Sequence, residues 1–230
     1  SAMAEGLDDV ALAIASLSAV SSYTPTLSAA SFDDIQFWVG SGENRAALVI
    51  DWNDGKSSES LVWGYRWDGT ANGLDMLQAV ISADPRLYGH FGSYVWGTAI
   101  QGLGYDLNGN GFSVSPSLTF DAGGLAFTTS PDDLRTASDA ADHYIEGWDY
   151  GFWAYYNKSS ADEAWTSALI GAEFRALSDG VWDGYSFAPE FSGPEPGEPF
   201  AAPIPEPTIF AMTFLGAGIV LFRRVRANRD

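Results

Sequence analysis

The sequence contains no cysteine and only two histidines, His90 and His143. The absence of cysteine excludes disulfide bonds, thiolate metal sites and a cysteine nucleophile, and two histidines leave little for a histidine-rich metal centre. Cations are scarce as well, since 11 Lys and Arg face 30 Asp and Glu, for a formal net charge of −19. Because a surface without clustered Lys and Arg repels the phosphate backbone, we expect no nucleic-acid binding.

Aromatic side chains are abundant, with 9 Trp, 10 Tyr and 14 Phe, and apolar residues make up 46% of the 230-residue chain. This supply is enough for a packed core, and the length suits one domain with appendages. We divide the chain into an N-terminal segment 1–30, an acidic body 31–191, a Pro-rich linker 192–204 and a C-terminal tail 205–230. The prolines of the linker exclude a helix or a central strand and predict an extended spacer.

The C-terminal tail has three parts. It begins with a Pro-Glu-Pro motif at Pro205, Glu206 and Pro207. The uncharged stretch 208–222 follows, and at about 1.5 Å per residue it covers ~22 Å, less than the ~30 Å of a bilayer core. The basic residues at the end of the chain are Arg223, Arg224, Arg226 and Arg229. These parts predict a short membrane-spanning helix with a cytoplasmic C-terminus and with the body on the other side.

The order of these parts at the extreme C-terminus closely resembles the PEP-CTERM sorting signal of Gram-negative bacterial exosortase substrates. The resemblance implies export across the inner membrane, recognition by an exosortase, cleavage near the motif, and delivery to the cell surface or extracellular matrix. An ordinary C-terminal membrane anchor is the alternative. Members of this family differ widely in the domains that precede the signal, so the tail predicts where the protein is delivered and predicts no activity.

The N-terminal segment carries a candidate signal peptide. Residues 10–20 form an apolar run of the right length, and residues 28–30 supply small side chains for a cleavage site. The positive n-region is missing, because Glu5, Asp8 and Asp9 stand where Lys or Arg is expected. We expect a signal peptide here, and an amphipathic helix over residues 7–19 is the alternative.

Short β-type runs separated by turn residues dominate the body. The expected strands are 35–39, 46–52, 61–67, 93–100, 118–120, 125–128, 151–156 and 181–187. Asn72 is a candidate N-cap for a helix over 73–82, and the sequence 130–133 predicts the start of a second helix that runs to about residue 141. The expected fold class is mostly β, an antiparallel β-sandwich-like single domain with two short helices.

The segment 106–111 fits the first half of a calcium loop, in which Asp106, Asn108 and Asn110 would supply alternate oxygen ligands. The second half does not fit, because Ser117 stands at the twelfth position, where a bidentate Glu is expected. Two interpretations stay open. One is a partial calcium site completed by Asp121 or another distant carboxylate, and the other is an Asn-Gly hairpin turn that joins two strands.

Aromatic residues next to Asp and Asn are candidates for a ligand groove, since flat rings stack on the apolar faces of sugars and neighbouring polar groups fix hydroxyls. The alternative is that these rings form the core and the sheet edges. The wider set of aromatic residues that could line such a groove also includes Trp52, Trp96, Trp165 and Tyr156. The candidate ligand-binding residues are Trp63, Trp67, Trp148, Tyr150, Trp153, Tyr155 and Trp182.

No catalytic residue is assigned, because the sequence lacks a G-x-S-x-G motif and its many acidic residues make any carboxylate pair uninformative. We therefore expect an exported, exosortase-sorted surface or matrix protein that binds a glycan or small molecule without catalysis. Its expected partners are the exosortase, the export machinery and, through the tail helix, the membrane. A secreted carboxylate-dependent glycan hydrolase and a purely structural matrix protein are the alternatives.

Overall fold

The computed structural model describes residues 31–128 and 134–205. The candidate signal peptide, the start of the second expected helix and the tail from Glu206 onward lie outside these ranges. Within them, no helix has the length and apolar character needed to cross a membrane. The expected spanning stretch 208–222 is among the residues that are not described.

A large mixed sheet forms the first layer of the body. Its strands lie in the order β1–β3–β2–β12–β10–β11, and β13 also pairs with β3. Three of the pairings are parallel, namely β1 with β3, β13 with β3 and β12 with β2, so the expectation of an antiparallel sheet is wrong in this respect. The strands are β1 Trp38–Gly40, β2 Asn44–Asp51, β3 Ser60–Trp67, β10 Gly151–Lys158, β11 Thr166–Ser167, β12 Trp182–Pro189 and β13 Phe200–Ala201.

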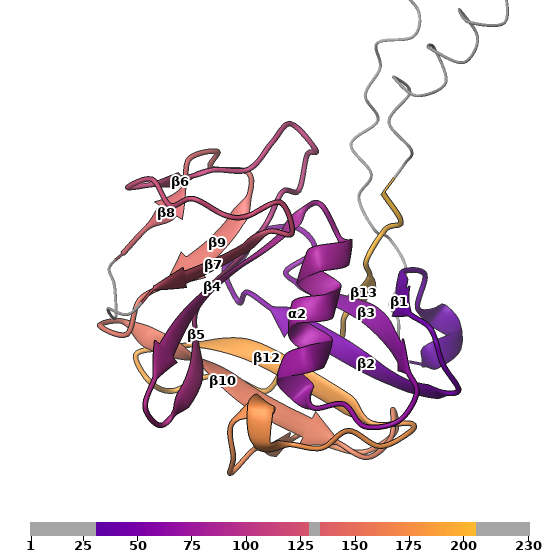
Figure 1. The fold of residues 1–230 in the computed structure, drawn as a ribbon. Coiled ribbons are helices and arrows are strands. Elements are labelled where there is room, and N and C mark those ends of the chain that lie inside the picture. The colour runs from indigo at the N-terminus through magenta and orange to yellow at the C-terminus, as the bar shows by residue number, and fades with distance from the viewer. Residues whose placement is uncertain (1–30, 129–133, 206–230) are drawn as a thin grey trace, which may run out of the picture.

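A small sheet forms the second layer, with its strands in the order β7–β4–β5–β9. These strands are β4 Leu87–Tyr94, β5 Gly97–Tyr105, β7 Leu125–Thr128 and β9 His143–Glu146. A two-stranded ribbon of β6 Val114–Ser115 and β8 Thr136–Ala137 lies beyond it in Figure 1. The described helices are η1 Phe32–Asp34, α2 Gly73–Ala83 and η2 Ala172–Phe174.

The main core lies between the two sheets and under α2, which covers the seam between them in Figure 1. Trp52, directly after β2, joins the layers, because its indole N–H donates to the carbonyl of Leu103 on β5 at 3.0 Å. The main core includes Leu48, Ile50, Leu61, Trp63, Met76, Leu77, Val80, Ile81, Phe91 and Leu103.

The opposite face of the large sheet is also covered, and a second cluster of buried residues forms there. Val49 on β2 and Trp182 on β12 belong to this cluster, together with Ile35 before β1 and Ala201 in β13. Strand β2 is therefore buried on both faces, which explains its nearly continuous apolar sequence.

The Pro-rich segment 192–204 is extended, as expected, but it packs along the large sheet. Its Phe200 and Ala201 form β13 beside Leu61 and Val62 of β3. The N–H of Gly197 donates to Asp51 at 2.7 Å. Since proline cannot donate in a ladder, this segment joins the sheet only at its edge, where Phe200 and Ala201 pair with β3.

The expected strands 46–52, 61–67, 125–128, 151–156 and 181–187 are confirmed as β2, β3, β7, β10 and β12. The expected strand 93–100 is wrong, because the chain reverses at Val95 and Trp96 between β4 and β5. Residues 118–120 form no strand, and the strand expected over 35–39 begins only at Trp38. The described part of the second expected helix is also wrong, because Thr136–Ala137 pairs with β6 as β8.

The expected helix at 73–82 is confirmed as α2, and a capping box holds its N-terminus. The side chain of Asn72 accepts from the N–H of Asp75 at 2.9 Å, and the side chain of Asp75 accepts from the N–H of Asn72 at 2.9 Å. These reciprocal bonds satisfy two backbone donors at the start of the helix.

Replacing Asn72 by Ala should lower the free energy of unfolding by about 1 kcal/mol, because it removes the N-cap acceptor. Replacing Asn72 by Ser should retain most of the stability, because a hydroxyl oxygen can accept the same bond. Urea unfolding measures both variants. Equal stability of the Ala variant and the unchanged protein would contradict the role given to this cap.

Candidate functional site

Three aromatic side chains form an exposed surface at one end of the small sheet, which we call the aromatic platform: Tyr94, Trp96 and Trp148. The rings of Tyr94 and Trp96 are stacked, with centroids 4.7 Å apart and an interplanar angle of 2°. The ring of Trp148 lies 5.7 Å from Tyr94 and 6.3 Å from Trp96. Trp96 is 61% exposed and Trp148 is 36% exposed.

The platform stands on the tight turn between β4 and β5. Val95 and Trp96 are the two residues between the paired ends of these strands, and Gly97 follows with φ of 129°. A Cβ at Gly97 would come within 2.1 Å of Glu173 Oε1, and the other oxygen of Glu173 accepts from the N–H of Thr98 at 3.1 Å. Helix η2 therefore supports the turn that presents Trp96.

A chain of polar side chains on the small sheet runs back from the platform. The amide of Gln101 donates to the hydroxyl of Tyr94 at 2.7 Å, and the hydroxyl of Thr128 donates to Gln101 at 3.0 Å. The ring of His90 lies 3.1 Å from Thr128 through Nε2 and 2.9 Å from Glu146 through Nδ1. This polar chain holds Tyr94 in place from the interior of the protein.

Glu146 ends the polar chain and is held by several donors. Tyr144 donates its hydroxyl to Oε2, and Arg135 donates its backbone N–H at 3.0 Å and its guanidinium at 2.9 Å to Oε1. Burial raises the pKa of Glu146, but the hydrogen bonds from His90, Tyr144 and Arg135 outweigh burial and hold that pKa below its usual value. Glu146 is therefore kept ionised and in a fixed position.

The order Glu146, His90, Thr128 is that of an acid–base–nucleophile triad. Its proton arrangement is different, because the hydroxyl of Thr128 donates to Gln101, whereas a nucleophile must give its proton to the histidine. Glu146 also binds Tyr144 and Arg135 in addition to the histidine. The geometry therefore suits a rigid support for Tyr94 better than nucleophilic catalysis.

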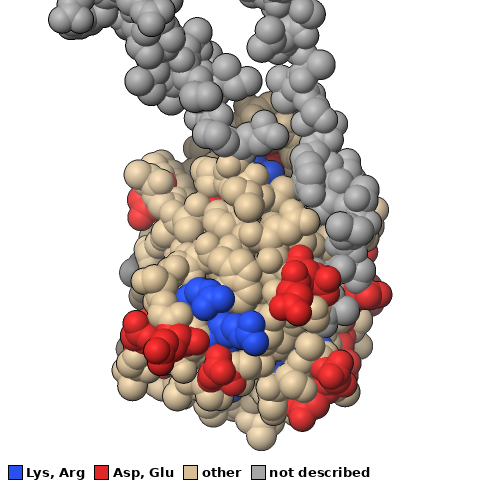
Figure 2. Space-filling view, turned by 90° about the vertical axis from the view of Figure 1, so that its right-hand side faces the viewer, with Lys and Arg blue, Asp and Glu red and all other residues tan. Residues whose placement is uncertain are grey.

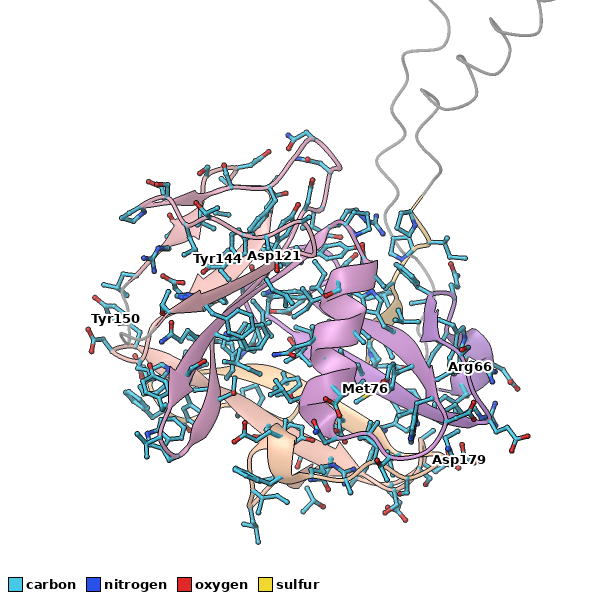
Figure 3. The ribbon with its side chains drawn as sticks, in the orientation of Figure 1. Arg66, Met76, Asp121, Tyr144, Tyr150 and Asp179 are labelled. Carbon is cyan, nitrogen blue, oxygen red and sulfur yellow. The ribbon has the colours of Figure 1, made fainter. Side chains whose placement is uncertain are left out.

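The structure brings two of the seven candidate aromatic residues to the surface. Trp148 belongs to the platform, and Tyr150, which is 61% exposed, points outward nearby in Figure 3. Tyr155 is half-buried and donates its hydroxyl to Asp183. The other four pack in the two clusters of buried residues and line no accessible groove, namely Trp63, Trp67, Trp153 and Trp182.

These four are buried because they lie on strands of the large sheet, which is covered on both faces. The sequence reasoning missed Tyr94 and the turn that presents Trp96, since it placed residues 93–100 in a single strand. The available signal was Gly97 directly after Trp96, because glycine tolerates the positive φ that such a tight turn needs.

The candidate calcium loop 106–111 connects β5 with β6. Asp106 accepts from the N–H groups of Gly109 at 2.7 Å and Gly111 at 2.9 Å. The alternative of a hairpin turn is wrong, because β5 and β6 belong to different sheets. The side chains of Asn108 and Asn110 both donate to the same oxygen of Asp139, at 3.0 and 2.9 Å.

Asp121, the carboxylate suggested for completing the site, accepts instead from the N–H groups of Gly123 and Leu125 in its own turn. Hydrogen bonds from the N–H of Ala141 and from Asn108 and Asn110 lower the pKa of Asp139 to about 2. Within residues 31–128 and 134–205, no three Asp, Glu, His or Cys side chains converge as a preformed metal site.

Two other surface features fit a ligand less well. A pocket of about 160 Å³ lies between the end of α2 and the turn 121–124, and it is smaller than the ~300–1,000 Å³ typical of small-molecule sites. On the face shown in Figure 2, acidic side chains surround a small basic group and no broad basic area is visible. The aromatic platform is therefore the stronger candidate site.

No protein-family model, no curated protein and no solved structure matches the chain. Its function must therefore be inferred from the residues and geometry of the site itself.

Replacing Glu146 by Gln should lower the free energy of unfolding by about 3 kcal/mol at pH 7, because His90 and Arg135 then lose a buried anionic partner. The folded pKa of Glu146 lies below its usual value, so its contribution is complete above the unfolded pKa of about 4.3 and is lost as pH falls through the folded pKa. The difference between the variant and the unchanged protein should therefore shrink in acid.

Urea unfolding from pH 7 down to pH 3 measures this difference. Replacing the exposed Glu43 by Gln is the matched control and should change stability by less than about 0.5 kcal/mol at every pH. A stability loss in the Glu146 variant that does not change with pH would show that its carboxylate charge is not the source of stabilisation.

Proposed function

We propose that the protein is an exported cell-surface or extracellular-matrix protein that binds a glycan through the aromatic platform. The observation that carries this proposal is the arrangement of the exposed Trp96 and Trp148 around the half-buried ring of Tyr94, on which Trp96 stacks. Exposed aromatic rings in one group are unusual in a monomeric protein and mark interaction surfaces. Sugar rings are suitable ligands, because their C–H faces stack on flat aromatic rings.

The rigidity of the platform supports a binding role. The polar chain fixes Tyr94, and Glu173 supports the turn that carries Trp96. A ligand that binds to rings already in position loses less free energy to ordering side chains. The exposed Tyr150, two residues after Trp148, extends the polar and aromatic surface along the same loop.

The charge of the chain narrows the class of glycan. With a net charge of −19, the protein repels polyanions, so we propose a neutral or cationic polysaccharide. The proposed sorting signal in the tail would deliver the protein to the cell surface or matrix, where such polysaccharides occur. A hydrolase is disfavoured, since Glu146, the carboxylate at the end of the polar chain, is fixed by His90 and Arg135, and Glu173 is engaged by the N–H of Thr98.

Replacing Trp96 or Trp148 by Ala should weaken polysaccharide binding about tenfold, because losing roughly 1.4 kcal/mol of stacking corresponds to a factor of ten. Pull-down on cellulose and chitin and affinity electrophoresis in soluble β-glucan measure the binding. The anionic polymer alginate should not bind.

Phe191 provides the matched control, because it is 60% exposed and belongs to a separate stacked pair with Phe152. Its replacement by Ala should leave binding unchanged. Equal binding by the Trp96 variant and the unchanged protein would contradict the proposed surface, and release of reducing sugar from any of these polymers would favour the hydrolase instead.

The proposed sorting signal makes a separate prediction about processing. In a host that contains an exosortase, the intact mass of the mature protein should correspond to a C-terminus near Pro205. Replacing Pro205, Glu206 and Pro207 together by Ala should leave the tail in place and the protein in the membrane fraction. A mature chain that still ends at Asp230 would support an ordinary membrane anchor.

A further inference from the structure

A buried carboxylate oxygen next to the loop 106–111 has no hydrogen-bond partner. Asp142 is 0% exposed, and its Oδ1 accepts from the N–H of Leu107 at 3.1 Å, whereas its Oδ2 has no donor. Asp106 and Asp139 lie close enough to repel this carboxylate. An unsatisfied buried carboxylate oxygen is costly, and binding of an ion is one of the few ways to satisfy it.

Further oxygen-bearing side chains lie near this carboxylate on two segments that hydrogen bonds hold together. Asp106, Asn108 and Asn110 come from the loop after β5, while Asp139 and Asp142 come from the turn before β9. The amides of Asn108 and Asn110 converge on one oxygen of Asp139. A half-turn of the Asn110 amide would bring its carbonyl oxygen to the place where its nitrogen now lies. The Oδ1 of Asn108 already accepts from the N–H of Asn110 at 3.1 Å and keeps a second lone pair for an ion.

Protein cations compensate this negative charge only in part. Lys56 attracts both Asp139 and Asp142. Its ammonium group, however, donates to the backbone carbonyl of Asp142 and lies 3.5 Å from the carboxylate of Asp54. Its charge is therefore shared with a fourth acidic group, and the unpaired oxygen of Asp142 receives no bond from it.

We propose that the loop 106–111 and the turn 139–142 together form a calcium site, with Asp106, Asn108, Asn110, Asp139 and Asp142 as its ligands. Since no three Asp, Glu, His or Cys side chains of the described residues already form a metal-holding group, these ligands close around the ion only when it binds. Calcium takes six to eight oxygen ligands in flexible geometry and accepts both carboxylates and amide carbonyls. Magnesium demands a stricter octahedron and keeps more water, and zinc prefers nitrogen or sulfur ligands. Asp142 supplies the buried charge that the loop motif alone lacks at its twelfth position.

Thermal unfolding and calorimetry of the full chain test this proposal. Millimolar calcium should raise the unfolding midpoint by at least ~3 °C above its value in EDTA, and titration calorimetry should give one calcium per chain. Equimolar magnesium should produce less than half of the shift. No shift with calcium, or an equal shift with magnesium, would overturn the assignment.

Two variants locate the site. Asp142→Asn and Asp139→Asn should each abolish the calcium shift. Without calcium, the Asp142 variant should be at least as stable as the unchanged chain, because it removes a repelled charge from the interior. If the Asp142 variant fails to fold, the more exposed Asp139 variant still decides the question.

Asp121→Asn is the matched control, because Asp121 also accepts two backbone N–H bonds within a turn but contributes to no such cluster. It should keep the full calcium shift and the one-to-one stoichiometry. A calcium shift that survives in both the Asp139 and the Asp142 variants would identify general screening of the acidic surface and overturn the site.

Discussion

The indole of Trp52 fixes the position of one sheet on the other. It is fully buried, its N–H binds the carbonyl of Leu103, and its ring stacks on His143 at 4.6 Å with an interplanar angle of 9°. His143 in turn lies 2.9 Å from the carboxylate of Asp54, in the loop after β2. One side chain of the large sheet therefore contacts both β5 and β9 of the small sheet. Because both contacts are buried, a shift of the small sheet would break a hydrogen bond and expose an aromatic pair.

Both candidate sites depend on this placement. The turn at one end of β5 carries Trp96, and the loop at its other end carries Asp106. The residue pairing of β5 with β4 and β9 determines which side chains meet at each end. The two ends differ in chemistry, since rings collect at one and oxygen atoms at the other. A single strand held by Trp52 thus separates an aromatic candidate surface from a polar, charged one.

The sequence allowed the local features to be predicted more completely than the contacts between distant segments. The alternation in β3 and β10 and the Asn72 cap are local patterns, and each appears in the structure where it was expected. Which aromatic rings are exposed depends on the covering of the large sheet by segments far away in the chain. The sequence therefore left open whether Trp63 and Trp182 line a groove or form the core, and both are buried. The approach of Asp142 to residue 107 could not be predicted for the same reason, because it requires β5 and β9 to pair.

The pairing of β2 with β12 brings Ala47 beside Trp182, so the centre of the large sheet joins residues from opposite ends of the body. Strand β3 likewise pairs with β1, from the start of the body, and with β13, from the end of the body. Chains dominated by such long-range pairings fold slowly, because loop closure precedes the contacts that stabilise it. The large sheet cannot form completely until β12 is available to pair with β2 and β10. For a chain that crosses a membrane unfolded, this topology postpones folding until nearly the whole body has emerged on the far side.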